Sequence, residues 1–314
     1  MKFYPQDINE YFTTDHQVDR LIQVAESRHT LQFEQLKRLI TFSCTNTIGN
    51  HLTAAVLVTG PSSSGKTTFS KRLCNLMAEE GFHCTVISID DYYLSKDEIR
   101  RKQPGVEKPD YEVLEAFDVA YFQKQMTAFL EGEAIHLPHY DFKLGHRVDS
   151  GKILTPTEKD LLIIEGIHAM NPKLTEGLAF ARTVGVYICP FDSYTIPGQG
   201  EITSREIRLM RRSIRDFKHR NSSVMQTLEM WPSVRAGEER YIKPMKQYAD
   251  FFFNSSFEYE ICILKARMLE AIRDLTEEEL TQLKQYLPLH LLNAFHSCME
   301  ANIPETSIFN EFYR

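Results

Sequence analysis

The stretch from Gly60 to Thr67 constrains this chain more than any other part of its sequence. It reads Gly-Pro-Ser-Ser-Ser-Gly-Lys-Thr and fits the pattern G-x-x-x-x-G-K-[ST], whose glycines let the backbone N–H groups curl inward. Residues 54–58 before it form an apolar run typical of a buried strand, and residues 68–80 after it show helical spacing. Strand, loop and helix in this order predict a phosphate-binding loop.

Each part of this loop has a physical task in holding a nucleotide. The inward N–H groups and the positive end of the following helix hold the α- and β-phosphates. Lys66 is expected to reach the β- and γ-phosphates, and the Thr67 hydroxyl to sit on Mg²⁺. We therefore expect ATP or GTP with Mg²⁺ to bind on Gly60, Pro61, Ser62, Ser63, Ser64, Gly65, Lys66, Thr67 and Thr68.

Short apolar segments alternate with helical patterns along the chain. The candidate strands are rich in Val and Ile without alternating apolar and polar residues, and they are 54–58, 85–89, 160–164 and 183–188. That pattern is typical of strands covered on both faces. The sequence predicts an α/β fold of the P-loop NTPase type, a mostly parallel sheet with helices on both faces and a helical lid, with further helices at 112–131 and 203–219.

Three regions are expected along the chain. Residues 1–50 carry apolar residues at helical spacing and predict an N-terminal extension of two short amphipathic helices. Residues 51–264 form the P-loop domain, in which 251–253 and 259–264 are each compatible with a strand or a helix. Residues 265–314 predict a helical C-terminal extension packed on that domain.

Composition limits the partners of the chain. Its formal net charge of −7 gives no general attraction to nucleic acid or anionic lipid. No apolar run is long enough to span a membrane, and the N-terminus lacks the apolar core of a signal peptide. The spacing of the six cysteines suits neither a zinc site nor a disulfide framework. We expect a cytoplasmic protein with reduced thiols, no membrane contact and no nucleic-acid partner.

Two acidic residues follow predicted strands. Asp90 ends the strand at 85–89 and Glu165 ends the strand at 160–164. Ligands of parallel α/β sheets bind beyond the carboxyl ends of the strands. There, Asp90 can accept the proton of an attacking hydroxyl, and Glu165 can hold Mg²⁺ together with Thr67. The alternatives are an acidic pair, Asp90 and Asp91, that caps the next helix, and a solvated turn carboxylate at Glu165.

The predicted helix at 203–219 is strongly basic. Arg208, Arg212 and Arg215 are spaced i, i+4 and i+7 and share one face. Guanidinium groups suit phosphate oxygens, and a lid that carries them could neutralise charge on a transferring phosphoryl group. A solvated helix face and an RNA contact are the alternatives.

These pieces, in this order, resemble the uridine kinase family and its wider relatives, the phosphoribulokinase-like P-loop kinases. The matching segments lie within about 54–256 and are 60–68, 90–93, 112–118, 140–142, 165–168, 208–220 and 243–250. A closer likeness is to bacterial uridine kinase-like proteins that often carry a threonyl-tRNA-synthetase-like N-terminal region. It rests on residues 165–172, 230–234 and 303–308. Residues 1–50 resemble only the helical connection that precedes their kinase domain.

The resemblance implies catalytic roles. Asp90 matches the general base that takes the proton of a nucleoside 5′-hydroxyl, while Lys66, Arg212 and Arg215 match residues that stabilise charge on the phosphates. Thr67 with Glu165 matches the Mg²⁺ site.

The resemblance also implies an acceptor pocket. Tyr93, Tyr140 and Phe142 match residues that line the base, and Glu112 sits where the family has an aspartate that holds the ribose hydroxyls. Arg212 and Arg220 match lid residues that contact the substrate.

Two departures from the family pattern touch this pocket. Glu112 is one methylene longer than the usual aspartate, and Gly145 stands where uridine–cytidine kinases have a histidine. The resemblance implies an ATP- or GTP-dependent kinase of a nucleoside 5′-hydroxyl, of uridine or cytidine type. The alternatives are another acceptor (a phosphorylated sugar, pantothenate or another nucleoside) or a non-catalytic nucleotide-binding regulator. The family likeness allows a homo-oligomer.

Overall fold

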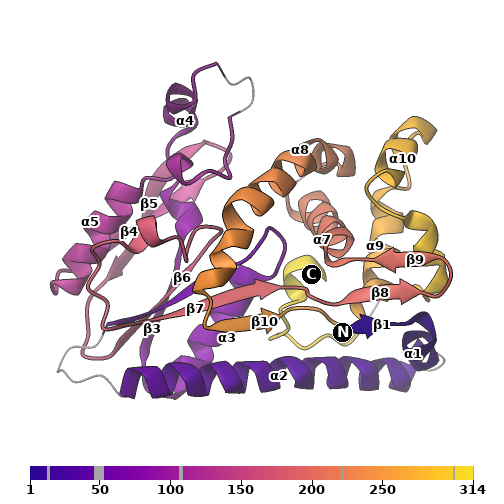
Figure 1. The fold of residues 1–314 in the computed structure, drawn as a ribbon, viewed down its shortest axis with the longest axis horizontal. Coiled ribbons are helices and arrows are strands. Elements are labelled where there is room, and N and C mark those ends of the chain that lie inside the picture. Colours follow the sequence, from indigo (N-terminus) through magenta and orange to yellow (C-terminus); the bar gives the residue numbers. More distant parts are fainter. Residues whose placement is uncertain (13–14, 46–52, 106–108, 221, 300, 314) are drawn as a thin grey trace.

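Five parallel strands form the central sheet of the protein, whose computed structural model describes residues 1–12, 15–45, 53–105, 109–220, 222–299 and 301–313 (Figure 1). In neighbour order they are β10 (Phe251–Asn254), β7 (Arg182–Cys189), β2 (Ala54–Thr59), β6 (Asp160–Glu165) and β3 (His83–Ser88). Every adjacent pair is parallel. The α/β P-loop fold predicted from the sequence is confirmed, and all four predicted strands form.

Each face of the sheet carries its own apolar core. Alternate residues of β2 point to opposite faces, so Val56 and Val58 join one core while Ala55 and Leu57 join the other. Helices α2 (Asp15–Thr45), α3 (Lys66–Glu79), α7 (Ser204–His219) and α9 (Glu260–Ala271) contribute to the first core, and α5 (Val119–Leu130) and α6 (Pro172–Thr175) to the second. Burial on both faces explains why the strands read as continuous apolar runs.

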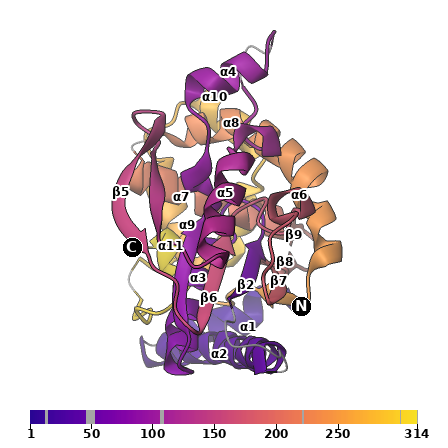
Figure 2. The same cartoon turned by 90° about the vertical axis from the view of Figure 1, so that its left-hand side faces the viewer.

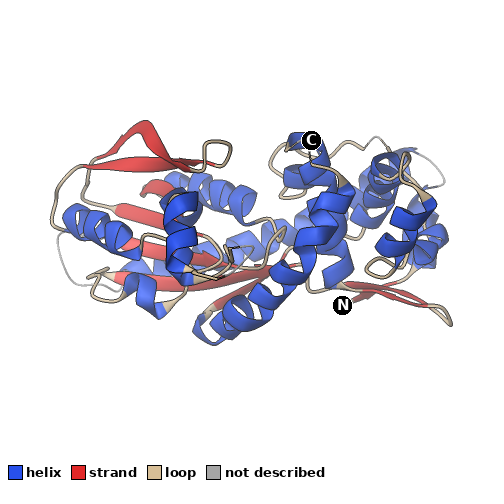
Figure 3. Ribbon diagram, turned by 90° about the horizontal axis from the view of Figure 1, so that it is seen from above, coloured by secondary structure: helices blue, strands red, loops and turns tan. Residues whose placement is uncertain are grey.

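Among the described residues, two smaller sheets lie outside the central one, and the sequence patterns predict neither of them. β4 (Ile135–Asp141) and β5 (His146–Leu154) form an antiparallel hairpin, which Figures 2 and 3 show set apart from the central strands. β1 (Lys2–Phe3) pairs with β8 (Ser193–Ile196), which pairs with β9 (Gly200–Ile202). The N-terminal region therefore includes a strand as well as helices.

The expectation of two short helices in residues 1–50 is wrong. After the short α1 (Pro5–Asn9), a single helix of 31 residues, α2, lies along one side of the molecule (Figure 1). Its sequence contains neither glycine nor proline, so nothing breaks it, and Leu21, Ala25, Phe33 and Ile40 are buried along it. The expected boundary between residues 50 and 51 lies outside the described residues.

Other helix bounds also differ from the expected ones. The helix expected at 112–131 begins only at Val119, because Asp118 caps its first turn and accepts a hydrogen bond from the Tyr121 backbone N–H. Residues 251–253 belong to β10 and residues 259–264 largely to α9. Because α9 runs through Ala271, the expected domain boundary at 264/265 cuts a helix whose residues are part of the core.

The described residues also form several further helices and short turns. The other α-helices are α4 (Lys96–Lys102), α8 (Val224–Gly237), α10 (Glu277–Lys284) and α11 (Asn310–Tyr313). Short 3₁₀ or π turns occur at η1 (Glu10–Phe12), η2 (Ile89–Tyr92), η3 (Leu114–Ala116), η4 (Glu238–Ile242), η5 (Lys243–Tyr248) and η6 (Leu289–Ala294). Across the residues that the structure describes, no helix has both the length and the apolar character to cross a membrane.

Candidate active site

The carboxyl ends of three adjacent strands bring the predicted catalytic groups together. β2 leads into the phosphate loop, β6 ends at Glu165, and β3 is followed by Asp90 in the η2 turn. Since β6 lies between β2 and β3 and all three are parallel, these ends meet at one edge of the sheet. This is the position where open α/β sheets bind their ligands.

The phosphate loop has the close backbone packing that its glycines predict. Gly65 caps helix α3 in the left-handed region at φ 94°, and a Cβ at Gly60 would lie 2.1 Å from the Ile188 carbonyl oxygen. Lys66 Nζ donates to the carbonyl oxygens of Gly60 (2.9 Å) and Pro61 (3.2 Å). The lysine side chain therefore lies across the loop. The N–H groups in the first turn of α3 also point toward the loop.

The two residues expected to hold Mg²⁺ are in contact. Thr67 Oγ1 donates to Glu165 Oε1 at 3.3 Å, and Ser88 Oγ donates to the same oxygen at 3.0 Å. Burial, and then the charge of Asp90, raises the pKa of Glu165 to about 7, although Lys66 opposes the rise. A carboxylate with hydroxyl neighbours is an oxygen donor set that fits Mg²⁺. Ser88 was not singled out in the sequence because one strand-end serine carries no pattern.

Asp90 lies among charges of both signs. Burial raises the pKa of its carboxyl group, and Asp91 adds to the rise, whereas Lys66, Arg220 and Arg215 oppose it. Its neighbour Asp91 has a different environment, because Asp91 Oδ1 accepts from the Tyr140 backbone N–H and from His139 Nδ1, both at 3.0 Å. Asp91 thus ties the β4–β5 hairpin to the end of β3, and Asp90 is the acid beside the phosphate loop.

Three of the predicted acceptor residues form one aromatic cluster. The Tyr93 ring lies 5.5 Å from that of Tyr140 and 6.2 Å from that of Phe142, and Tyr140 lies 5.0 Å from Phe142. Tyr93 also stacks on Phe117 at 4.1 Å. Tyr93 and Tyr140 are buried while Phe142 is 60% exposed, so the cluster opens to solvent at Phe142.

Glu112 has a buried carboxylate oxygen without a hydrogen bond. Its Oε2 finds no partner in the part of the chain that the structure describes, whereas its backbone carbonyl accepts from His168 Nε2 at 2.8 Å. Burial raises the pKa of Glu112 to about 7, with Arg212 opposing the rise and Asp90 adding to it. An unsatisfied buried acceptor costs free energy, which a hydroxyl group of a ligand would recover.

The departure at Gly145 has a structural reason. Gly145 adopts φ +75°, and a Cβ there would lie 2.5 Å from Lys96 Cδ. A histidine at this position would need both a left-handed backbone and a displaced lysine.

Two arginines of the basic helix α7 are buried and do not belong to a solvated helix face. Arg208 and Arg211 are 2% and 0% exposed and pair with Glu238 at 2.5 Å and Glu260 at 2.7 Å. Arg208 Nη1 also donates to the Ser62 carbonyl oxygen at 3.3 Å. These two arginines therefore hold α7 against the rest of the fold, and the solvated-face alternative is wrong for them.

Three further arginines of this basic run gather around one buried carboxylate, Asp216. Arg212, Arg215 and Arg220 pair with it at 3.4, 3.1 and 3.3 Å. Arg212 Nη1 also donates to Ser62 Oγ at 2.8 Å. Asp216 therefore groups the expected phosphate-binding arginines beside the loop. In the sequence it was only one acid within a basic run, so its role was missed.

Comparisons with known proteins agree with this architecture. The family model described as "Phosphoribulokinase / Uridine kinase family" matches residues 55–194. Over 194 residues the chain is 29% identical to the uridine kinase of Clostridium tetani and 30% identical to that of Borrelia hermsii, covering 62% of this chain and 82% of each relative. A solved structure assigned to a fructose transport system kinase of Silicibacter sp. TM1040 shares the fold, with a TM-score of 0.51 and 16% identity over 70% of this chain and 98% of that one.

Proposed function

Because the chain belongs to the phosphoribulokinase / uridine kinase family, we propose that it phosphorylates the 5′-hydroxyl of a nucleoside of uridine or cytidine type, with ATP or GTP as donor. One observation carries the choice of acceptor. The Glu112 carboxylate, whose Oε2 has no hydrogen-bond partner among the described residues, is close enough to Asp90 and Arg212 for their charges to move its pKa. A sugar hydroxyl at Glu112 would thus lie near the proposed base and the proposed phosphate-binding arginine.

In this proposal, Asp90 removes the proton of the acceptor hydroxyl. The acceptor oxygen then forms a bond to the γ-phosphorus, and the bond from that phosphorus to the β–γ bridging oxygen breaks to release ADP or GDP. Lys66, Arg212 and Arg215 neutralise the charge on the transferring group. Thr67 and Glu165 would hold Mg²⁺, which supplies positive charge next to the phosphates.

The aromatic cluster supplies the other half of the acceptor site. Tyr93, Tyr140 and Phe142 offer ring faces for a base, and Glu112 accepts hydroxyl groups of the ribose. Arg212 and Arg220 both pair with Asp216; Arg212 also donates to Ser62 of the phosphate loop, and its charge acts on Glu112, while the charge of Arg220 acts on Asp90. In this proposal both arginines contact the substrates.

The test is ADP release from MgATP with and without a panel of nucleosides led by uridine and cytidine. Strong stimulation by one of them supports the proposal and identifies the acceptor. Stimulation by a phosphorylated sugar or by pantothenate instead would keep the kinase and replace its acceptor. Nucleotide binding without stimulation by any of these compounds would contradict the proposal and favour a nucleotide-binding regulator.

The ionisation of Glu112 predicts how acceptor binding depends on pH. The folded-state pKa of Glu112 is about 7, raised from 4.5, so the ionised form, in which Oε2 is a charged acceptor, dominates only above neutrality. We expect the KM for the nucleoside to fall about 5-fold as the pH rises through neutrality, since one hydrogen bond to a charged acceptor is gained.

Glu112→Gln should raise this KM and remove its pH dependence. The assay uses saturating MgATP, so that the ionisation of Glu165, whose pKa is also about 7, does not alter the measured KM for the nucleoside. A KM that keeps its pH dependence in Glu112→Gln would assign that dependence to another group.

A further inference from the structure

The C-terminal segment of the chain, residues 303–313, packs directly on the phosphate loop. A Cβ on Gly65 would lie 2.3 Å from Ile308 Cγ2, so this side chain rests against the backbone of the loop. Ile308, Phe309 and Phe312 are at most 1% exposed. The family-model match ends at residue 194, and the function proposed above uses none of these residues.

Glu311 brings a negative charge to the same place. Its Oε2 accepts from the Thr68 backbone N–H at 3.3 Å. Thr68 lies in the first turn of α3, among the N–H groups that the loop pattern assigns to the phosphates of a nucleotide. A carboxylate therefore occupies an anion position of the phosphate loop.

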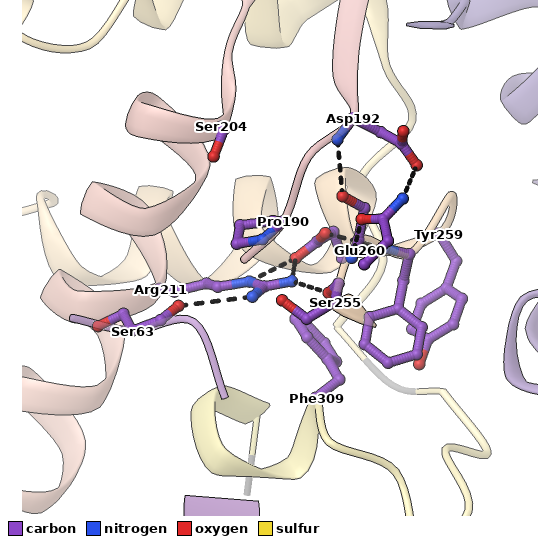
Figure 4. Close-up of polar contacts among 12 residues, drawn as sticks. Ser63, Pro190, Asp192, Ser204, Arg211, Ser255, Tyr259, Glu260 and Phe309 are labelled. Atoms are coloured by element: carbon purple, nitrogen blue, oxygen red, sulfur yellow. Dashed lines mark hydrogen bonds and ion pairs between the residues drawn. The ribbon is translucent and has the colours of Figure 1, made fainter. Parts of the chain in front are cut away.

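Contacts with α7 and α9 hold the segment in this position. The Arg211 guanidinium lies 4.9 Å from the centre of the Phe312 ring, and Lys218 Nζ donates to the Tyr313 carbonyl oxygen at 2.7 Å. The Arg267 guanidinium lies 5.6 Å from the centre of the Tyr313 ring. Figure 4 shows Arg211 between Ser63 of the loop and Glu260, with Phe309 beside this group. The segment thus connects the phosphate loop to the arginine-bearing helix.

We propose that residues 303–313 form an autoinhibitory segment, in which the Glu311 carboxylate takes the place of a nucleotide phosphate at the start of α3. The proposal rests on nucleotide binding at the loop, which is part of the proposed function. A carboxylate and a phosphate cannot both accept from the Thr68 N–H, and two negative groups at the same N–H would repel each other. Bound nucleotide therefore displaces Glu311 and loosens the segment that carries it.

The first test compares MgADP binding by calorimetry in the full chain and in Glu311→Gln, which keeps the shape of the side chain and removes its charge. We expect the variant to bind about 3- to 10-fold more tightly, because the displaced group is a charged acceptor at a helix N-terminus. Glu133→Gln is the matched control. Glu133 is exposed in the turn between α5 and β4, on the side of the second core, so its loss should leave affinity unchanged.

The second test measures hydrogen exchange of residues 303–313 in the unmodified chain, with and without saturating MgADP. We expect faster exchange when the nucleotide is bound. Equal affinities together with unchanged exchange would make the segment a fixed wall of the site and overturn the proposal, as would weaker binding by Glu311→Gln. If neither the unmodified protein nor Glu311→Gln bound MgADP, the autoinhibitory proposal and the proposed function would both be overturned.

The two proposals can fail separately. Tighter binding by Glu311→Gln without any nucleoside-stimulated ADP release would keep the autoinhibitory segment and remove the nucleoside kinase. Nucleoside-stimulated release with equal affinities and unchanged exchange would keep the kinase and remove the segment as an inhibitor.

Discussion

Asp90→Asn is expected to lower kcat by about 10³-fold, the usual contribution of a positioned general base. The amide cannot accept the proton of the acceptor hydroxyl, although it has the size of the carboxyl group. Burial raises the pKa of Asp90, which makes its carboxylate a stronger base, while Lys66, Arg220 and Arg215 keep it from rising further. Since the phosphate loop is untouched, MgADP affinity should stay within about twofold, an electrostatic effect of removing one nearby charge. Turnover and calorimetric binding are the two measurements.

Asp91→Asn is the matched control for this variant, because it removes the same charge from the next residue. Asp91 accepts from the Tyr140 N–H and contacts His139, and an asparagine oxygen can still accept from the backbone. We expect a loss in kcat of less than about 10-fold, since a neutral hydrogen bond replaces a charged one. Near-wild-type turnover in Asp90→Asn, or equal losses in both variants, would remove Asp90 as the base.

The parts of the site that could be predicted are those that follow from strand direction. Once residues 54–58, 85–89 and 160–164 are taken as parallel strands, the loop after β2, Asp90 and Glu165 must lie at the same edge of the sheet, and the observed order β2–β6–β3 makes them neighbours there. The loop pattern itself also fixes the glycine positions, because Gly60 and Gly65 leave no space for a side chain. These predictions need only local pattern and topology.

The parts that could not be predicted depend on contacts between distant segments. Arg208 and Arg212 share a helix face by spacing and both donate to Ser62, yet Arg208 also forms a buried pair with Glu238. Nothing in the sequence near α7 announces those partners. Likewise, the contact between Glu311 and Thr68 joins residues 243 positions apart, and it depends on how the whole C-terminal region packs. Tertiary packing therefore decides which charges are structural and which remain near the phosphate loop.

The buried pair of Arg211 and Glu260 gives the largest expected effect on stability. Both side chains are 0% exposed, and Arg211 Nε donates to Glu260 Oε2 at 2.7 Å (Figure 4). Arg211 Nη2 also donates to the Ser255 carbonyl oxygen at 2.7 Å, while Glu260 Oε1 accepts from the Phe257 N–H at 3.0 Å. Burial raises the pKa of Glu260, and Arg211 acts against the rise. The pair is therefore stable only while both charges are present.

Glu260→Gln is expected to lower the free energy of unfolding by about 3–5 kcal/mol, because it leaves the Arg211 charge buried without a counter-ion. Urea denaturation measures this loss. The double variant Arg211→Met with Glu260→Leu should lose less than the single variant, since replacing both charges by apolar groups removes the desolvation cost. As a control, Glu239→Gln breaks an exposed pair with Lys243 and should cost less than about 1 kcal/mol. If Glu260→Gln lowered the free energy of unfolding no more than Glu239→Gln, the buried pair would not be what holds α7 on α9.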